Sequence, residues 1–131
     1  MSRRTRTRKG EARAPVLKSF DCSEIDDIES WVPASSAVCY WLTLSIGAPD
    51  SDGADNFQVC VAMPDGLKSP EGRRIKPKGN QPAPIVVQEY SWAEVLREIE
   101  RRLNACAGRN WAEMQEGLRL QMNWEYEDYK P

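Results

Sequence analysis

The chain has 131 residues, about the length of one domain, and 40% of them are hydrophobic, enough to build a single core. It contains no histidine and no run near the roughly 18 apolar residues of a membrane span, which excludes histidine-based catalysis, histidine metal ligands and a transmembrane anchor. The formal charge of -2 conceals two opposed parts, because residues 1–18 hold seven bases and one acid, whereas residues 19–67 hold nine acids and no base.

Residues 1–15, MSRRTRTRKGEARAP, are charged and almost free of large apolar side chains. Such a segment buries too little to offset its ordering entropy, so it is predicted to be a disordered basic arm before a single domain at 16–131. Short basic tails bind nucleic acid without specificity, so two interpretations stay open for the arm, nucleic-acid binding and no role.

Strands dominate the first half of the predicted domain. Residues 16–22, VLKSFDC, are predicted to form a strand, followed by an acidic turn or single helical turn that ends at Pro33. Residues 38–46 and 57–63 then alternate apolar and polar side chains with a period of two. The loop between them is rich in Gly, Pro and Asp, which predicts an antiparallel hairpin with one apolar face turned to the core.

That hairpin loop, IGAPDSDGADNF, also invites comparison with a calcium-binding loop. Counting from Asp50, an EF-hand needs glycine at position 6 and glutamate at position 12, but Asp55 and Val61 stand there. The spacing excludes that motif, and turn chemistry alone explains the residues. We expect no metal site.

The second half is predicted to contain helices. Residues 64–84 lack periodicity and read as a long exposed loop, and 85–90, IVVQEY, as a further strand. The sequences SWAE and NWAE, at Ser91 and Asn110, have the capping-box pattern of two helix starts. The first helix turns an apolar stripe to the core and is expected to end near Gly108, with solvent-facing charges at Arg97, Glu98, Glu100, Arg101 and Arg102.

The second helix is expected to stop at Gly117, because residues 118–126, LRLQMNWEY, change to a period of two and suggest a final strand. The prediction is an α+β fold, with an antiparallel or mixed sheet of about five strands and two helices near the C-terminus packed on one face.

Reactive chemistry is sparse. The four cysteines are widely spaced among apolar neighbours, as buried thiols of a cytoplasmic protein would be, and no imidazole is available to activate Ser or Cys. No phosphate-binding glycine motif occurs, and the basic clusters are not interleaved with aromatics for nucleic-acid stacking. We therefore expect no catalytic residue, no cofactor and no specific nucleic-acid site, which leaves a binding module.

Several segments together resemble the immunity protein 8 family of bacterial polymorphic toxin systems: DIESWVP, CYWLTLSIG, DNFQVCVAMP, IVVQEYSWAEVLREIERRL and NWEYEDY. The similarity spans roughly residues 16–129. It implies a cytoplasmic protein encoded beside a toxin, which binds the toxin domain and blocks it. Two features depart from the family pattern: the basic arm is an extension, and Gly66 in MPDGL stands where a larger residue is expected.

From residue 19 onward the chain has 19 acids and 11 bases, a net charge of -8, which suits a basic toxin domain. The candidate partner-binding residues are therefore acids and two possible aromatic anchors: Asp26, Asp27, Glu29, Trp31, Trp41, Asp50, Asp52, Asp55, Glu125, Glu127 and Asp128. For each single residue the simpler explanation is preferred, which is solubility for an acid and core packing for a tryptophan. The alternative function is a scaffold or nucleic-acid-associated protein that acts through the basic arm.

Overall fold

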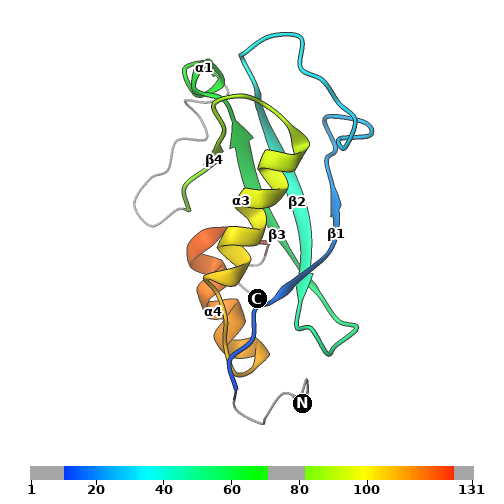
Figure 1. Ribbon diagram of the computed structural model, residues 1–131, viewed down its shortest axis with the longest axis vertical. Coiled ribbons are helices and arrows are strands. Elements are labelled where there is room, and N and C mark those ends of the chain that lie inside the picture. Colours follow the sequence, from blue (N-terminus) through cyan, green and yellow to red (C-terminus); the bar gives the residue numbers. More distant parts are fainter. Residues whose placement is uncertain (1–10, 71–81, 126–131) are drawn as a thin grey trace, which may run out of the picture.

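The computed structural model describes residues 11–70 and 82–125. In this part of the chain a five-stranded sheet is covered on one face by two C-terminal helices (Figure 1). The elements are β1 (Val16–Asp21), β2 (Cys39–Gly47), β3 (Asp55–Ala62), α1 (Pro64–Leu67), β4 (Ile85–Val86), α3 (Trp92–Asn104), α4 (Trp111–Gln121) and β5 (Asn123–Trp124). The predicted α+β class is confirmed.

The sheet is mixed. Strands β1, β2 and β3 are antiparallel neighbours, β4 lies parallel to β3, and β5 pairs antiparallel with the other end of β3. The predicted hairpin is the largest part of this sheet, with Tyr40 opposite Val61 and Leu44 opposite Phe57. These four side chains are at most 2% exposed, so the face selected by the alternation is the core face.

Both predicted helix starts are confirmed. The side chain of Ser91 accepts a hydrogen bond from the backbone of Glu94 at 3.1 Å, and Asn110 does the same for Glu113 at 2.9 Å. The return half of the capping box differs, because the Glu113 carboxylate accepts from the backbone N–H of Arg109, one residue before the cap.

The end of the second helix was predicted wrongly. Helix α4 continues through Gly117 to Gln121, and the last strand has two residues instead of nine. Met114, Leu118 and Met122 are fully buried at a spacing of four, whereas Leu120 is 76% exposed, so the helical period wins over the apparent alternation. Gly117 does not end the helix; a Cβ there would lie 3.3 Å from Cys106, so the glycine allows close packing.

Arg102 was also placed wrongly, on the solvent side of α3. It is 6% exposed, and its guanidinium donates to the backbone carbonyls of Ala83, Pro84 and Gln121 at 2.8–3.1 Å. It thereby ties the segment before β4 to the end of α4. Burial lowers the pKa of Arg102 and the neighbouring Glu98 carboxylate opposes that shift.

The chain makes ordered contacts before the predicted domain boundary at residue 16. The backbone N–H and C=O of Arg13 each hydrogen-bond to the backbone of Gly108 at 2.9 Å, and the Arg13 side chain forms an ion pair with Asp50. Arg13 therefore contacts the folded region, whereas residues 1–10 of the predicted arm lie outside the described residues.

The predicted loop after β3 begins with the short helix α1, and its residues 71–81 lie outside the described residues. Gly66 lies inside α1 and is buried. A Cβ on Gly66 would stand 1.7 Å from the carbonyl oxygen of Val38. The larger residue expected from the family pattern therefore does not fit this backbone.

Candidate partner-binding site

The predicted partner-binding residues divide between the two ends of the hairpin. The β1–β2 connection (residues 22–38), at the top of Figure 1, carries Asp26, Asp27, Glu29 and Trp31. The β2–β3 turn, at the bottom, carries Asp50 and Asp52, and Asp55 follows it as the first residue of β3. Strand β2 has nine residues, so the two groups are roughly 27 Å apart. The two groups therefore form separate clusters on the surface.

At the β2–β3 turn, two of the three predicted acids have partners within the chain. The Asp50 carboxylate pairs with Arg13 at 2.9 Å, and a hydrogen bond from this guanidinium lowers the pKa of Asp50. The Asp55 carboxylate accepts from the side-chain amide of Gln115 at 2.7 Å. Asp52 is exposed. The turn is thus held by its own contacts, which argues against a site built from all three acids.

Of the three predicted C-terminal acids, the structure describes Glu125, which lies at the end of the hairpin that carries the β2–β3 turn. The backbone N–H of Glu125 donates to the carbonyl of Asn56 at 3.1 Å, beside the β2–β3 turn. Glu127 and Asp128 lie outside the described residues.

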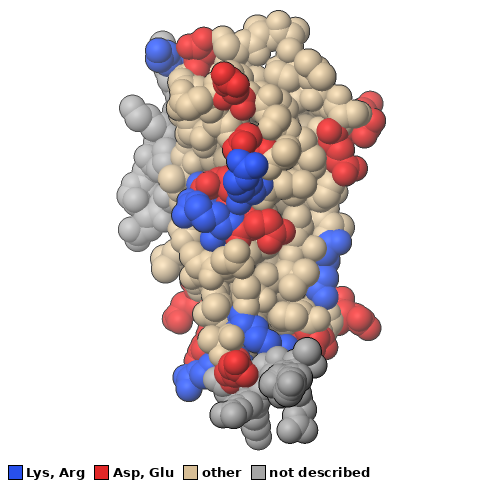
Figure 2. Space-filling view, viewed as in Figure 1, with Lys and Arg blue, Asp and Glu red and all other residues tan. Residues whose placement is uncertain are grey.

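The β1–β2 connection presents its acids to solvent around a buried centre. Ile28 is 5% exposed and anchors the segment, while Asp26, Asp27 and Glu29 are exposed. Asp27 adopts the left-handed backbone region (φ 51°), and its carboxylate accepts from the hydroxyl of Ser30. In the space-filling view, acidic side chains at the upper right have no basic neighbours, whereas both signs mix over α3 (Figure 2).

Trp31 is held in this connection by aromatic contacts. Its ring meets Tyr40 and Tyr90 edge-on, with centroids 5.8 Å and 5.2 Å apart. The hydroxyls of the two tyrosines hydrogen-bond each other at 2.7 Å. Burial raises the pKa of both phenols, so they stay neutral at physiological pH.

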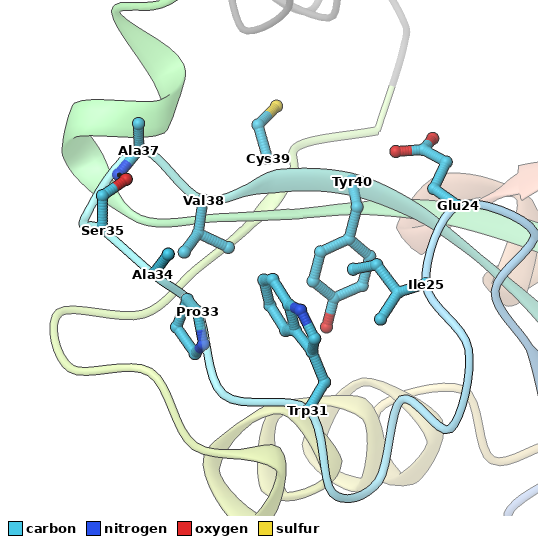
Figure 3. Close-up of a pocket in the computed structure, with 10 residues that line it drawn as sticks. All are labelled: Glu24, Ile25, Trp31, Pro33, Ala34, Ser35, Ala37, Val38, Cys39 and Tyr40. Carbon is cyan, nitrogen blue, oxygen red and sulfur yellow. Dashed lines mark hydrogen bonds between the residues drawn. The ribbon is translucent and has the colours of Figure 1, made fainter.

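A pocket of about 250 Å³ opens beside Trp31 at the start of β2 (Figure 3). Glu24 and Ile25 stand on one side, the run from Pro33 to Ala37 on the other, and Tyr40 at the back. Glu24 is the one charged residue in the lining. The volume is smaller than the roughly 300–1,000 Å³ of most small-molecule sites. The opening therefore suits a side chain better than a metabolite.

Of the residues around this pocket, sequence reasoning singled out Trp31 but not Glu24 or the two tyrosines. Glu24 lies in the same acidic run as Asp26, yet only the folded connection shows that it borders the pocket. Tyr90 is distant in sequence and joins Tyr40 through tertiary packing, which no local pattern encodes.

The second predicted anchor, Trp41, does not join this cluster. Its neighbours Tyr40 and Leu42 point into the core, so Trp41 lies on the other face of β2, opposite Cys60. It is partly exposed there, away from the pocket lining.

Within residues 11–70 and 82–125, no cluster of three or more Cys, Asp or Glu residues is placed to hold a metal ion. The helices of this same part are too short or too polar to cross a bilayer. The four cysteines form no disulfide bond, and the sulfurs of Cys39 and Cys60 lie 3.9 Å apart on neighbouring strands.

Comparison with known proteins gives one match. Residues 15–129 match the family model described as Immunity protein 8. Searches of curated proteins and of solved structures give no match.

Proposed function

Because the chain belongs to the immunity protein 8 family, we propose that it binds a cognate bacterial toxin domain and neutralises it by direct contact. The family match carries this proposal, since it spans nearly all of the folded region. The protein acts by occupation of the toxin surface and needs no catalytic group or cofactor of its own.

The charge distribution supports a basic toxin domain as the partner. Residues 19–67 contain nine acids and no base, and the exposed acids of the β1–β2 connection extend from this segment into solvent. Opposite charge accelerates association by long-range steering, and an acidic inhibitor can occupy a groove that binds phosphate. An immunity protein of this kind works in the cytoplasm of the cell that makes the toxin.

The proposal is tested with the toxin domain encoded beside the gene for this chain. Cells that express the toxin domain alone should stop growing, and co-expression of the chain should restore growth. A catalytically inactive toxin domain should form a complex with the purified chain in a direct binding measurement. Failure of both protection and complex formation would exclude this function for that toxin.

The rival function, a scaffold or nucleic-acid-associated protein that acts through the basic arm, is separated by truncation. Deletion of residues 1–10 removes five of the seven N-terminal bases but leaves the Arg13 contacts intact. An immunity protein keeps its toxin affinity after this deletion. A protein that works through the arm loses its affinity for its target.

A further inference from the structure

We propose that the pocket beside Trp31 receives a lysine or arginine side chain from the toxin domain, with Glu24 as its ion-pair partner. This inference rests on the proposed function and adds the place and chemistry of the contact. The pocket, its charge and its apolar rim each support it.

The first observation is the state of Glu24. It is exposed at the edge of the pocket, and within the described part of the chain its carboxylate has no ion pair and no hydrogen bond. Other carboxylates near a base are paired, as Asp50 is with Arg13 and Glu113 with Arg109. The Glu24 carboxylate is thus available to a basic group of a partner.

The second observation is the shape of the lining. Figure 3 shows Pro33, Ala34 and Ser35 on one side of the opening and Glu24 on the other. The Glu24 carboxylate lies on the same side of β2 as the Cys39 side chain, whereas Val38, Tyr40 and the Trp31 ring lie on the opposite side of the strand. A basic side chain lying across the opening would place its aliphatic stem over the apolar residues of the lining and its charged end at Glu24.

The third observation is the exposed apolar rim. Val32, between Trp31 and Pro33, is 80% exposed, more than any other large apolar residue in the described part of the chain. An exposed apolar side chain in a connection that also carries exposed acids resembles an interface centre with a polar rim. The contact would therefore combine burial of Val32 with pairing of Glu24.

The floor of the pocket is already assembled in the free protein. Trp31 packs against both tyrosines, and the Tyr40–Tyr90 hydrogen bond fixes the back wall. A preformed site loses less conformational entropy on binding, which favours a specific anchor at this position.

The first test is Glu24→Gln, measured by binding to the inactive toxin domain. Loss of a paired charge should weaken binding on the order of 30-fold, mainly through faster dissociation. Glu29→Gln is the matched control, because Glu29 is an exposed acid of the same connection outside the pocket lining. It should change affinity by less than about threefold, since rim charges act mostly on association.

A second variant blocks the opening. Ala34→Arg places a long basic side chain at the pocket edge, where it can pair with Glu24 in the free protein and exclude the toxin residue. Ala54→Arg is the control, an exposed alanine of the β2–β3 turn at the far end of the hairpin. The first should reduce toxin affinity strongly, whereas the second should not.

Charge reversal identifies the partner residue. Glu24→Lys should abolish tight binding, and one Lys→Glu or Arg→Glu substitution in the toxin domain should restore it. Unchanged unfolding midpoints would show that each variant is folded. If the wild-type chain binds the toxin but Glu24→Gln and Ala34→Arg bind equally well, the pocket is not the site and the immunity function stands. If the wild-type chain does not bind, the function itself fails, and this inference with it.

Discussion

The Arg13 guanidinium and the Asp50 carboxylate lie 2.9 Å apart and join the first described residues to the β2–β3 turn. The contact links a segment predicted to be disordered with a turn predicted to face a partner. Arg13 also exchanges two backbone hydrogen bonds with Gly108. These contacts give the two ends of the N-terminal arm different expected roles in stability.

Deletion of residues 1–15 should therefore lower the free energy of unfolding more than deletion of residues 1–10. Loss of the two backbone hydrogen bonds between Arg13 and Gly108 should cost about 1–3 kcal/mol. Deletion of residues 1–10 removes none of the Arg13 contacts. Urea unfolding of the two truncated proteins and the full chain measures the difference, and equal midpoints for both truncations would contradict it.

Arg102→Ala should be among the most destabilising substitutions of a charged residue in the described region. It leaves the carbonyls of Ala83, Pro84 and Gln121 without their donor and opens space beside α3. We expect a loss of roughly 3 kcal/mol or more in the free energy of unfolding. The control is Arg97→Ala on the exposed side of the same helix, which should stay within about 0.5 kcal/mol.

Gly66→Ala should destabilise the protein through a backbone collision. The added Cβ would meet the Val38 carbonyl at 1.7 Å, so α1 and the start of β2 must separate. A cost of roughly 3 kcal/mol is expected for such overpacking. Gly53→Ala, whose Cβ would approach only Ser51 Oγ at 3.5 Å, is the matched control and should be close to neutral. Thermal unfolding of the two variants makes the comparison.

The Glu98 carboxylate should contribute a pH-dependent stability. Hydrogen bonds from Arg101, and to a lesser extent from Arg102, lower the pKa of Glu98 below its ordinary 4.5. A lowered pKa in the folded state stabilises the protein above the unfolded pKa, and this stabilisation disappears as pH falls below about 4.5 through the folded pKa. Glu98→Gln should therefore flatten the decline of unfolding free energy between about pH 5 and pH 3. A parallel decline in both proteins would exclude this contribution.

Association kinetics should separate the two ends of the hairpin. Asp26→Lys together with Glu29→Lys should slow toxin association and flatten its dependence on salt, because steering acts through exposed, unpaired charge. Asp52→Lys at the β2–β3 turn should have a smaller effect. This substitution is preferable to reversal of all three turn acids, since Asp50 and Asp55 hold internal contacts. A larger effect at Asp52 would move the docking site to the turn.

The sequence predicted features whose signals are local. The alternation around Leu44 and Phe57 gave the hairpin and its buried face, and the N-caps Ser91 and Asn110 gave both helix starts. Local patterns failed where tertiary packing decides. The run from Leu118 to Met122 fits both periods, and the burial of Leu118 and Met122 in the tertiary structure, with Leu120 exposed, corresponds to the helical one.

In the candidate site, too, local sequence predicts some features and tertiary packing determines the others. Composition identified an acidic connection and Trp31, but composition cannot tell a paired acid from an unpaired one. Asp50 and Asp55 find partners in distant segments, through Arg13 and Gln115, whereas Glu24 borders a pocket made by residues on both sides of a bend. Such relationships depend on chain path and are absent from local sequence.

The bond between the hydroxyls of Tyr40 and Tyr90 has a consequence for how this protein can diverge. It fixes the wall behind Trp31 with residues that the fold itself requires, while Val32 and Ala34 remain at the exposed edge. Substitutions at that edge can follow changes in a toxin without disturbing the folding of the domain. One scaffold could thus acquire new partners through a few exposed positions, in the way that antibody loops vary on a constant framework.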